Sequence, residues 1–118
     1  MAIQSRVSQD RRGTSRIIVR QKCQITYEGV SREGVIVDLS LKGAFLSAKF
    51  LPPKDSDVTI TLRTPLLKRD LILTGKVVRG NWGMSDHGEL GRFGIRFSYS
   101  PLDLIEAINK LTSWRGDY

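Results

Sequence analysis

Arginine side chains are concentrated near the N-terminus of this chain of 118 residues. Arg11 and Arg12 stand next to each other, and Arg16 follows after a Gly-Thr-Ser stretch. A guanidinium group binds phosphate oxygens through two hydrogen bonds, docks on the O6 and N7 edge of guanine and stacks on flat bases, whereas lysine supplies only charge. The spacing therefore predicts binding of an anion with flat faces. A solubilising basic tail would have the same composition, so that interpretation stays open.

A second polar segment follows at Asp38-Leu-Ser-Leu-Lys-Gly43. The Asp38 carboxylate can accept from the ring and amino donors of guanine, the Ser40 hydroxyl can donate or accept, and Gly43 permits a positive φ or a close backbone approach. The same residues also suit an ordinary turn between strands, in which Asp and Ser side chains bond to their own backbone. Both interpretations are compatible with the residues alone.

Residues typical of catalysis or metal binding are sparse. His87 is the only histidine, and no cysteine or second histidine lies near it in the sequence, so we do not expect a metal site. Cys23 falls on the apolar side of an alternating stretch, which predicts a small buried side chain and not a nucleophile. The chain also has no phosphate-binding Gly-x-x-x-x-Gly-Lys-Ser/Thr loop. We therefore expect a protein that is not an enzyme and that has no metal or cofactor.

The charge balance indicates an anionic partner. The net charge is +7, and residues 1–32 hold seven basic side chains against two acidic ones. Such an excess attracts nucleic acid, a membrane surface, a phosphorylated small molecule or an acidic protein, and charge alone does not choose between them. No apolar run is long enough to span a bilayer, and the polar N-terminus lacks the apolar stretch of a secretory signal. We expect a cytoplasmic protein without membrane insertion.

Alternation of apolar and polar residues predicts about six short strands. They cover residues 17–28, 34–39, 44–48, 57–63, 70–79 and 93–97. Between the last two, residues 80–91 contain four glycines among polar residues and are predicted to form a mobile loop.

The end of the chain changes to helical spacing. After the helix-start residues Ser100 and Pro101, apolar residues recur at Leu102, Ile105, Ile108 and Leu111. We therefore expect an all-β protein with a terminal helix: a small six-stranded antiparallel β-barrel over residues 16–118, with the helix packed on it or over one mouth. Residues 1–15 lack periodicity and are expected to form a flexible basic arm.

Together, Arg12-Gly-Thr-Ser-Arg16 and Asp38-Leu-Ser-Leu-Lys-Gly43 resemble the paired motifs R-x-x-x-R and D/N-x-S-x-x-G of the PilZ domain, a family of bacterial receptors for cyclic di-GMP. Every defined position of both motifs is matched. Gly94-Ile-Arg-Phe97 is similar to the last strand of the family, whose members are six-stranded antiparallel barrels with a terminal helix.

The resemblance implies a role for each motif residue. Arg12 and Arg16 would bind the phosphates and the guanine Hoogsteen edges of cyclic di-GMP. Asp38, Ser40 and Gly43 would hold a guanine at the barrel surface.

Three further residues are candidates from the same resemblance. Arg11 adds a cation at a position that, in this family, often accompanies binding of an intercalated ligand dimer. Arg79 and Trp82 lie where some members make additional contacts, although Trp82 also suits a partly buried loop anchor.

We expect a receptor or adaptor in which cyclic di-GMP orders the N-terminal arm, creating a composite surface that relays the second-messenger level to a protein partner. One alternative is a basic β-barrel that binds single-stranded nucleic acid, which needs aromatic platforms along a basic groove. Phe45, Phe93 and Phe97 are instead predicted to be core, which argues against it. A second alternative is a PilZ-like adaptor without ligand, against which the intact motif positions argue.

Overall fold

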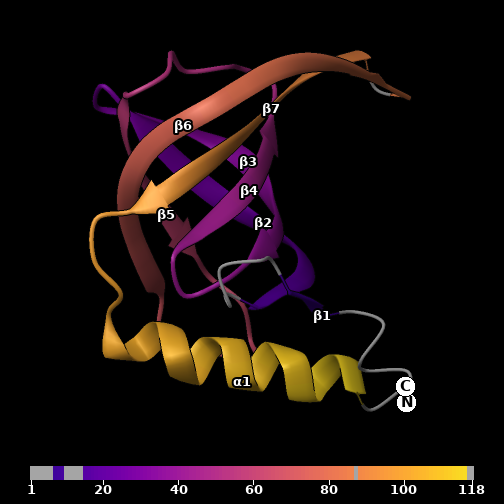
Figure 1. The fold of residues 1–118 in the computed structure, drawn as a ribbon, viewed down its shortest axis with the longest axis vertical. Coiled ribbons are helices and arrows are strands. Elements are labelled where there is room, and N and C mark those ends of the chain that lie inside the picture. The colour runs from indigo at the N-terminus through magenta and orange to yellow at the C-terminus, as the bar shows by residue number, and fades with distance from the viewer. Residues whose placement is uncertain (1–6, 10–14, 87, 117–118) are drawn as a thin grey trace.

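The computed structural model describes the backbone of residues 7–9, 15–86 and 88–116 (Figure 1). Seven strands precede one helix. The elements are β1 (Val7–Gln9), β2 (Ser15–Tyr27), β3 (Val30–Leu39), β4 (Gly43–Ala48), β5 (Asp57–Leu62), β6 (Leu71–Ser85), β7 (Gly88–Phe97) and α1 (Leu102–Gly116). The prediction of an all-β protein with a terminal helix is confirmed.

The strands form one antiparallel sheet that closes on itself. Its order is β1-β2-β3-β4-β7-β6-β5, and β5 also pairs with β2, where Ile25 lies opposite Ile60. Six strands, β2 to β7, therefore make the predicted ring, and β1 pairs with β2 outside it. The helix α1 crosses one end of this ring (Figure 1).

The core fills the inside of the ring because each strand places alternate residues inward. In β5, for example, Val58, Ile60 and Leu62 are at most 1% exposed, whereas the threonines between them are half-buried. Burying a side chain of this size stabilises a fold by about 1.5–3 kcal/mol. The strand positions that remain outside are therefore free to carry polar function.

The predicted apolar stripe of the helix faces the core only in its second half, where Leu111 is buried and Ile108 packs against the core. Leu104, Ala107 and Leu111 are buried, whereas Leu102 and Ile105 are 85% and 48% exposed. A strict three-residue repeat drifts around a helix of 3.6 residues per turn, so it cannot stay on one face, whereas steps of three and four can. Within the described residues, no helix has the length and apolar character needed to cross a membrane.

The predicted loop at residues 80–91 is wrong for its described part. β6 and β7 stay paired from Gly75 opposite Phe97 to Ser85 opposite Gly88, as a long hairpin that projects beyond the ring (Figure 1). The glycines were misleading because two of them serve packing: a Cβ at Gly91 would collide with the Phe50 carbonyl oxygen, and a Cβ at Gly80 would collide with the Phe93 side chain. His87, which falls in this stretch, lies outside the described residues.

The N-terminal segment contains regular structure that the sequence did not predict. Val7, Ser8 and Gln9 lie opposite Ile17, Arg16 and Ser15 of β2. An arm without structure is therefore not an adequate description of residues 7–9. Three residues are too few for an alternating pattern to be recognised. Residues 10–14, with Arg11 and Arg12, lie outside the described residues.

Candidate functional site

A groove with a volume of about 490 Å³ lies on the outer face of the sheet. Its lining comes from the start of β2, the turn between β3 and β4, the start of β4, the middle of β6 and the end of β7. The residues are Arg16, Ser40, Lys42, Gly43, Ala44, Phe45, Val78, Arg79, Gly94, Ile95 and Arg96. Small-molecule sites in proteins typically measure about 300–1,000 Å³, so this groove can hold a ligand of that class.

Strand register explains how residues distant in sequence meet at the groove. Ile18 lies opposite Asp38, Asp38 opposite Phe45, Phe45 opposite Gly94, and Gly94 opposite Arg79. This row crosses five strands on the outer face: in β2, β4 and β7 the positions on either side of it are buried, whereas in β6 the preceding residue, Val78, is exposed as well. Within this row, the acid Asp38 and the base Arg79 stand on either side of Phe45 and Gly94.

β-Bulges lie beside this row in three strands. The register shifts between Ile18 and Gln21 in β2, between Ile36 and Asp38 in β3, and between Val77 and Arg79 in β6. A bulge adds a residue to one strand and changes the direction of the following side chains. In β6 this leaves Val77 buried at 1% exposure but Val78 exposed at 42%, so Val78 and Arg79 both line the groove.

The turn between β3 and β4 forms one wall, and Ser40 holds it together. The Ser40 Oγ accepts hydrogen bonds from the N–H groups of Lys42 and Gly43, both at 3.2 Å, and the Ser40 N–H donates to the Gly43 carbonyl at 2.9 Å. Ser40 is only 4% exposed. Its side chain therefore bonds to its own backbone, the second of the two interpretations of this segment, and positions Lys42 and Gly43 at the groove.

Two glycines shape the groove for different reasons. A Cβ at Gly43 would collide with the Ile95 carbonyl oxygen, so Gly43 is needed for close approach of β4 to β7. A Cβ at Gly94 would have Val78 Cγ2 as its nearest neighbour at 3.5 Å, which is an ordinary contact. The space above Gly94 is therefore open and forms part of the groove floor, and packing does not require a glycine at this position.

Asp38 is a half-buried carboxyl beside the groove. Burial raises its pKa, while the nearby Arg16 guanidinium and a hydrogen bond from the Phe45 backbone N–H act in the opposite direction. Removal from water also strengthens any hydrogen bond that the carboxylate accepts from a ligand.

The charge of the groove is positive. Arg16, Lys42, Arg79 and Arg96 line it, and no carboxylate of the described residues does. Among the described residues, Lys42, Arg79 and Arg96 have no ion pair; those that occur join Arg63 to Asp70, Lys76 to Asp57 and Lys110 to Glu106. A concave surface with cations of this kind attracts an anion.

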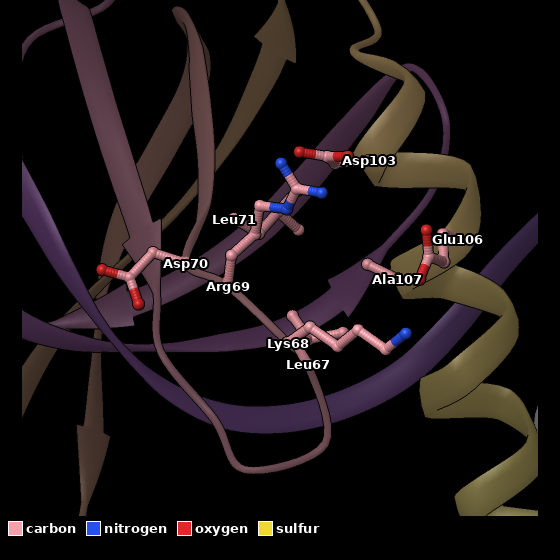
Figure 2. A pocket seen from close by; sticks show the side chains of 8 residues that line it. All are labelled: Leu67, Lys68, Arg69, Asp70, Leu71, Asp103, Glu106 and Ala107. Atoms are coloured by element: carbon pink, nitrogen blue, oxygen red, sulfur yellow. The ribbon is translucent and has the colours of Figure 1, made fainter.

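A second hollow, of about 40 Å³, lies between residues 67–71 and α1 (Figure 2). In Figure 2 the Arg69 side chain extends toward α1, which contributes Asp103 and Glu106. It holds little more than water, and its three acidic residues (Asp70, Asp103 and Glu106) outnumber its two basic ones (Lys68 and Arg69), so it does not favour an anion. The outer groove is therefore the better candidate for a ligand site.

The structure brings most of the predicted residues to the groove. Arg16, Ser40, Gly43 and Arg79 line it, and Asp38 lies beside it through register and through Arg16. Trp82 does not line the groove. It lies further along β6, opposite Gly91, and is 50% exposed.

Three groove residues were missed or misplaced by sequence reasoning. Lys42 occupies an unspecified position of the second motif, and Arg96 lies outside both motifs, although alternation in β7 already places Arg96 on the outer face. Phe45 was predicted to be core, but Ala44 and Leu46 take the inward positions of β4 at 7% and 0% exposure, which leaves Phe45 half-buried in the groove.

The structure is a small closed antiparallel barrel with a terminal helix and a cationic groove on its outer face. The chain belongs to the PilZ domain family, whose model matches residues 10–114. This match covers nearly all of the barrel and helix. No curated protein sequence matches the chain significantly.

Solved structures with the same fold are distant in sequence. The PilZ domain of YcgR from Escherichia coli, solved with c-di-GMP, superposes with a TM-score of 0.65 at 13% identity over 87% of this chain and 89% of that one. The Bacillus subtilis inhibitor of motility MotI (DgrA) gives 0.64 at 14% identity, over 91% of this chain and 52% of that one. The Borreliella burgdorferi PlzA protein, in complex with c-di-GMP, gives 0.54 at 15% identity over 81% and 45%. The chain spans about half the length of the last two proteins.

Proposed function

We propose that this chain is a receptor that binds cyclic di-GMP in the outer groove and relays the level of this second messenger to a protein partner. The observation that carries the proposal is the meeting of both motifs at one groove: Arg16 lines it, Ser40 and Gly43 form its wall, and Asp38 lies beside it. Family membership and the two neighbours solved with c-di-GMP support it.

The groove offers each part of such a ligand a matching contact. The two phosphates of cyclic di-GMP carry negative charge, which suits the two arginines of the first motif, Arg12 and Arg16. Asp38 is an acceptor for guanine ring and amino donors, which adenine does not present in the same pattern. Phe45 and Val78 provide apolar surface for the flat face of a base.

Nucleic-acid binding is less well supported by the same groove. Proteins that bind single strands stack successive bases on several aromatic side chains. Phe45 is the only aromatic residue among those that line the groove. A single platform suits one base of a small ligand better than a strand.

Isothermal titration calorimetry with cyclic di-GMP, cyclic di-AMP, GTP and a short single-stranded RNA tests the proposal. We expect cyclic di-GMP to bind most tightly, and the stoichiometry to show whether one molecule or an intercalated pair binds. Tighter binding of the RNA would favour the nucleic-acid function. Binding of none of the four would favour an adaptor that acts without ligand.

The relay has a test of its own. In this proposal the ligand holds the arginines at positions 11, 12 and 16 against the groove, and the surface so formed recruits the partner. Amide hydrogen exchange with saturating cyclic di-GMP should show new protection at residues 11–16 and little change in the barrel strands. Unchanged exchange at residues 11–16 with ligand bound would contradict this form of relay.

A further inference from the structure

Arg96 is a cation that the fold leaves without compensation. On β7 it lies opposite Gly43 of β4 on one side and Lys76 of β6 on the other. Like charges directly opposite one another destabilise an antiparallel strand pair. Lys76 has an ion pair with Asp57 at 2.9 Å, but no carboxylate in the described part of the chain pairs with Arg96. An anion bound in the groove would remove this repulsion.

Lys42 brings a second cation to the same end of the groove on a rigid turn. Its N–H donates to Ser40 Oγ at 3.2 Å, and its carbonyl accepts from the N–H of Phe97 at 2.8 Å. Phe97 directly follows Arg96, so the turn is fixed to β7 next to that arginine. The side chain of Lys42 is not used in these bonds and is exposed at the groove.

Arg96 lies on the opposite side of the groove from Arg16. In the sheet, β2 is followed by β3, β4 and β7, so Arg16 and Arg96 are three strand spacings apart. Neighbouring strands lie about 4.8 Å apart, which separates the two backbones by roughly 14 Å along the sheet. The groove thus has cations on two sides, with Phe45 on the floor between them.

We propose that Lys42 and Arg96 form a second phosphate-binding position, distinct from the one assigned to the R-x-x-x-R motif. The proposal rests on the proposed function, since the phosphate belongs to a cyclic dinucleotide. Arg96 supplies a planar donor pair for two phosphate oxygens, and Lys42 supplies a point charge from the turn.

The phosphate at this position has two possible sources with the same chemistry. It is either the second phosphate of the molecule that Arg16 binds, or a phosphate of a second molecule stacked on the first. Calorimetric stoichiometry separates them. With one ligand per chain, loss of Arg96 lowers the affinity of that single site; with two, it removes or weakens the second binding event.

The test is calorimetry with cyclic di-GMP on Arg96→Gln and Lys42→Gln, with Lys76→Gln as the matched control. Lys76 is a neighbouring exposed cation that does not line the groove. We expect the first two variants to lose about tenfold or more in affinity, or the second binding event, because each loses a charge-assisted contact. Lys76→Gln should stay within about twofold of the unchanged chain, because exposed charges contribute little.

Thermal unfolding without ligand separates binding from folding. We expect Arg96→Gln to unfold at the same temperature as the unchanged chain or at a higher one, since the substitution removes the repulsion from Lys76. In calorimetry, we expect Arg96→Lys to recover part of the affinity that Arg96→Gln loses. If Arg96→Gln does not fold, Lys42→Gln decides, because only the backbone of Lys42 supports the turn. The second phosphate-binding position is overturned if the unchanged chain binds and both Lys42→Gln and a folded Arg96→Gln bind with the same affinity and stoichiometry. The proposed function would then remain intact. No binding by the unchanged chain overturns both.

Discussion

Two groups of cations on the outer surface of the barrel have different surroundings. On the side formed by β5 and β6, Arg63 binds both carboxylate oxygens of Asp70 at 2.9–3.2 Å, and Lys76 binds Asp57 at 2.9 Å. This hydrogen bonding lowers the pKa of Asp70 and raises that of Arg63. Both of these cations therefore have a counter-charge in the fold.

The groove on β4, β6 and β7 is the opposite case. Lys42, Arg79 and Arg96 have no carboxylate partner among the described residues, and the acid beside the groove, Asp38, is half-buried near Arg16. Counter-charges were thus available to the fold elsewhere but not here. For recognising a ligand site, the presence of a basic residue is therefore less informative than whether the fold gives that residue a counter-charge. Cations without an ion pair in a concave surface indicate an anionic ligand.

The largest effect should come from the first motif. Changing Arg12 or Arg16 to Ala removes a charge-assisted bidentate contact and should weaken cyclic di-GMP binding by about 2 kcal/mol or more, roughly thirtyfold. Arg63→Ala is the matched control from the paired region and should leave the affinity unchanged. If folded Arg16→Ala and Arg63→Ala bind cyclic di-GMP with equal affinity in calorimetry, the cations of the groove do not differ in function from the paired cations near β5 and β6.

A pair of glycine variants separates the fold from the groove. Gly43→Ala forces a Cβ against the Ile95 carbonyl and should lower the free energy of unfolding by about 1–3 kcal/mol. In Gly94→Ala the added methyl group makes only ordinary contacts, so the free energy of unfolding should be retained. The same methyl group fills the groove floor and should reduce the affinity for cyclic di-GMP. Denaturant unfolding and calorimetry measure the two quantities. A Gly94→Ala variant that binds like the unchanged chain would show that the ligand does not reach this floor.

The smallest effect concerns Asp38 and depends on pH. Burial raises its pKa above the ordinary 3.8, so its contribution to stability is present at low pH and is lost as the pH rises through the raised value. Guanine donors require the ionised carboxylate, so affinity for cyclic di-GMP should instead fall as the pH is lowered toward that value. Calorimetry over this range should show the decline in the unchanged chain and not in Asp38→Ala.

Selectivity provides the control for the same residue. The unchanged chain should prefer cyclic di-GMP to cyclic di-AMP, and Asp38→Ala should lose most of that preference. Equal affinity of the unchanged chain for both ligands would mean that the groove recognises charge alone.

Regular strands could be predicted from the sequence where apolar and polar residues alternate without interruption. β5 is the clearest case, because Val58, Ile60 and Leu62 alternate with threonines and the predicted and observed strands differ only at Arg63. The β6–β7 hairpin could not be recognised, since glycines that permit close packing look the same in sequence as glycines of a loop. The buried face of α1 was predicted only in part because its apolar residues fit two patterns: a three-residue repeat from Leu102, and the mixed steps of three and four that join Leu104, Ala107 and Leu111.

The candidate site was only partly predictable, for a related reason. Arg16, Ser40 and Gly43 could be found because they stand at defined motif positions. Arg96 and Lys42 become functional candidates only when strand register and unpaired charge are known, and both are properties of the fold. The bulge that turns Val78 outward involves no glycine and leaves no sign in the sequence.

The turn at the groove wall also has a mechanical consequence. The Leu41 carbonyl accepts a hydrogen bond from Ser100 Oγ at 2.5 Å, and the Lys42 carbonyl accepts one from Phe97 N–H at 2.8 Å. α1 begins at Leu102, so two short, stiff links connect the groove wall to the start of the helix. A force applied to the turn is therefore transmitted to the helix end without passing through the core, and the outer surface there carries the exposed side chains of Leu102 and Ile105.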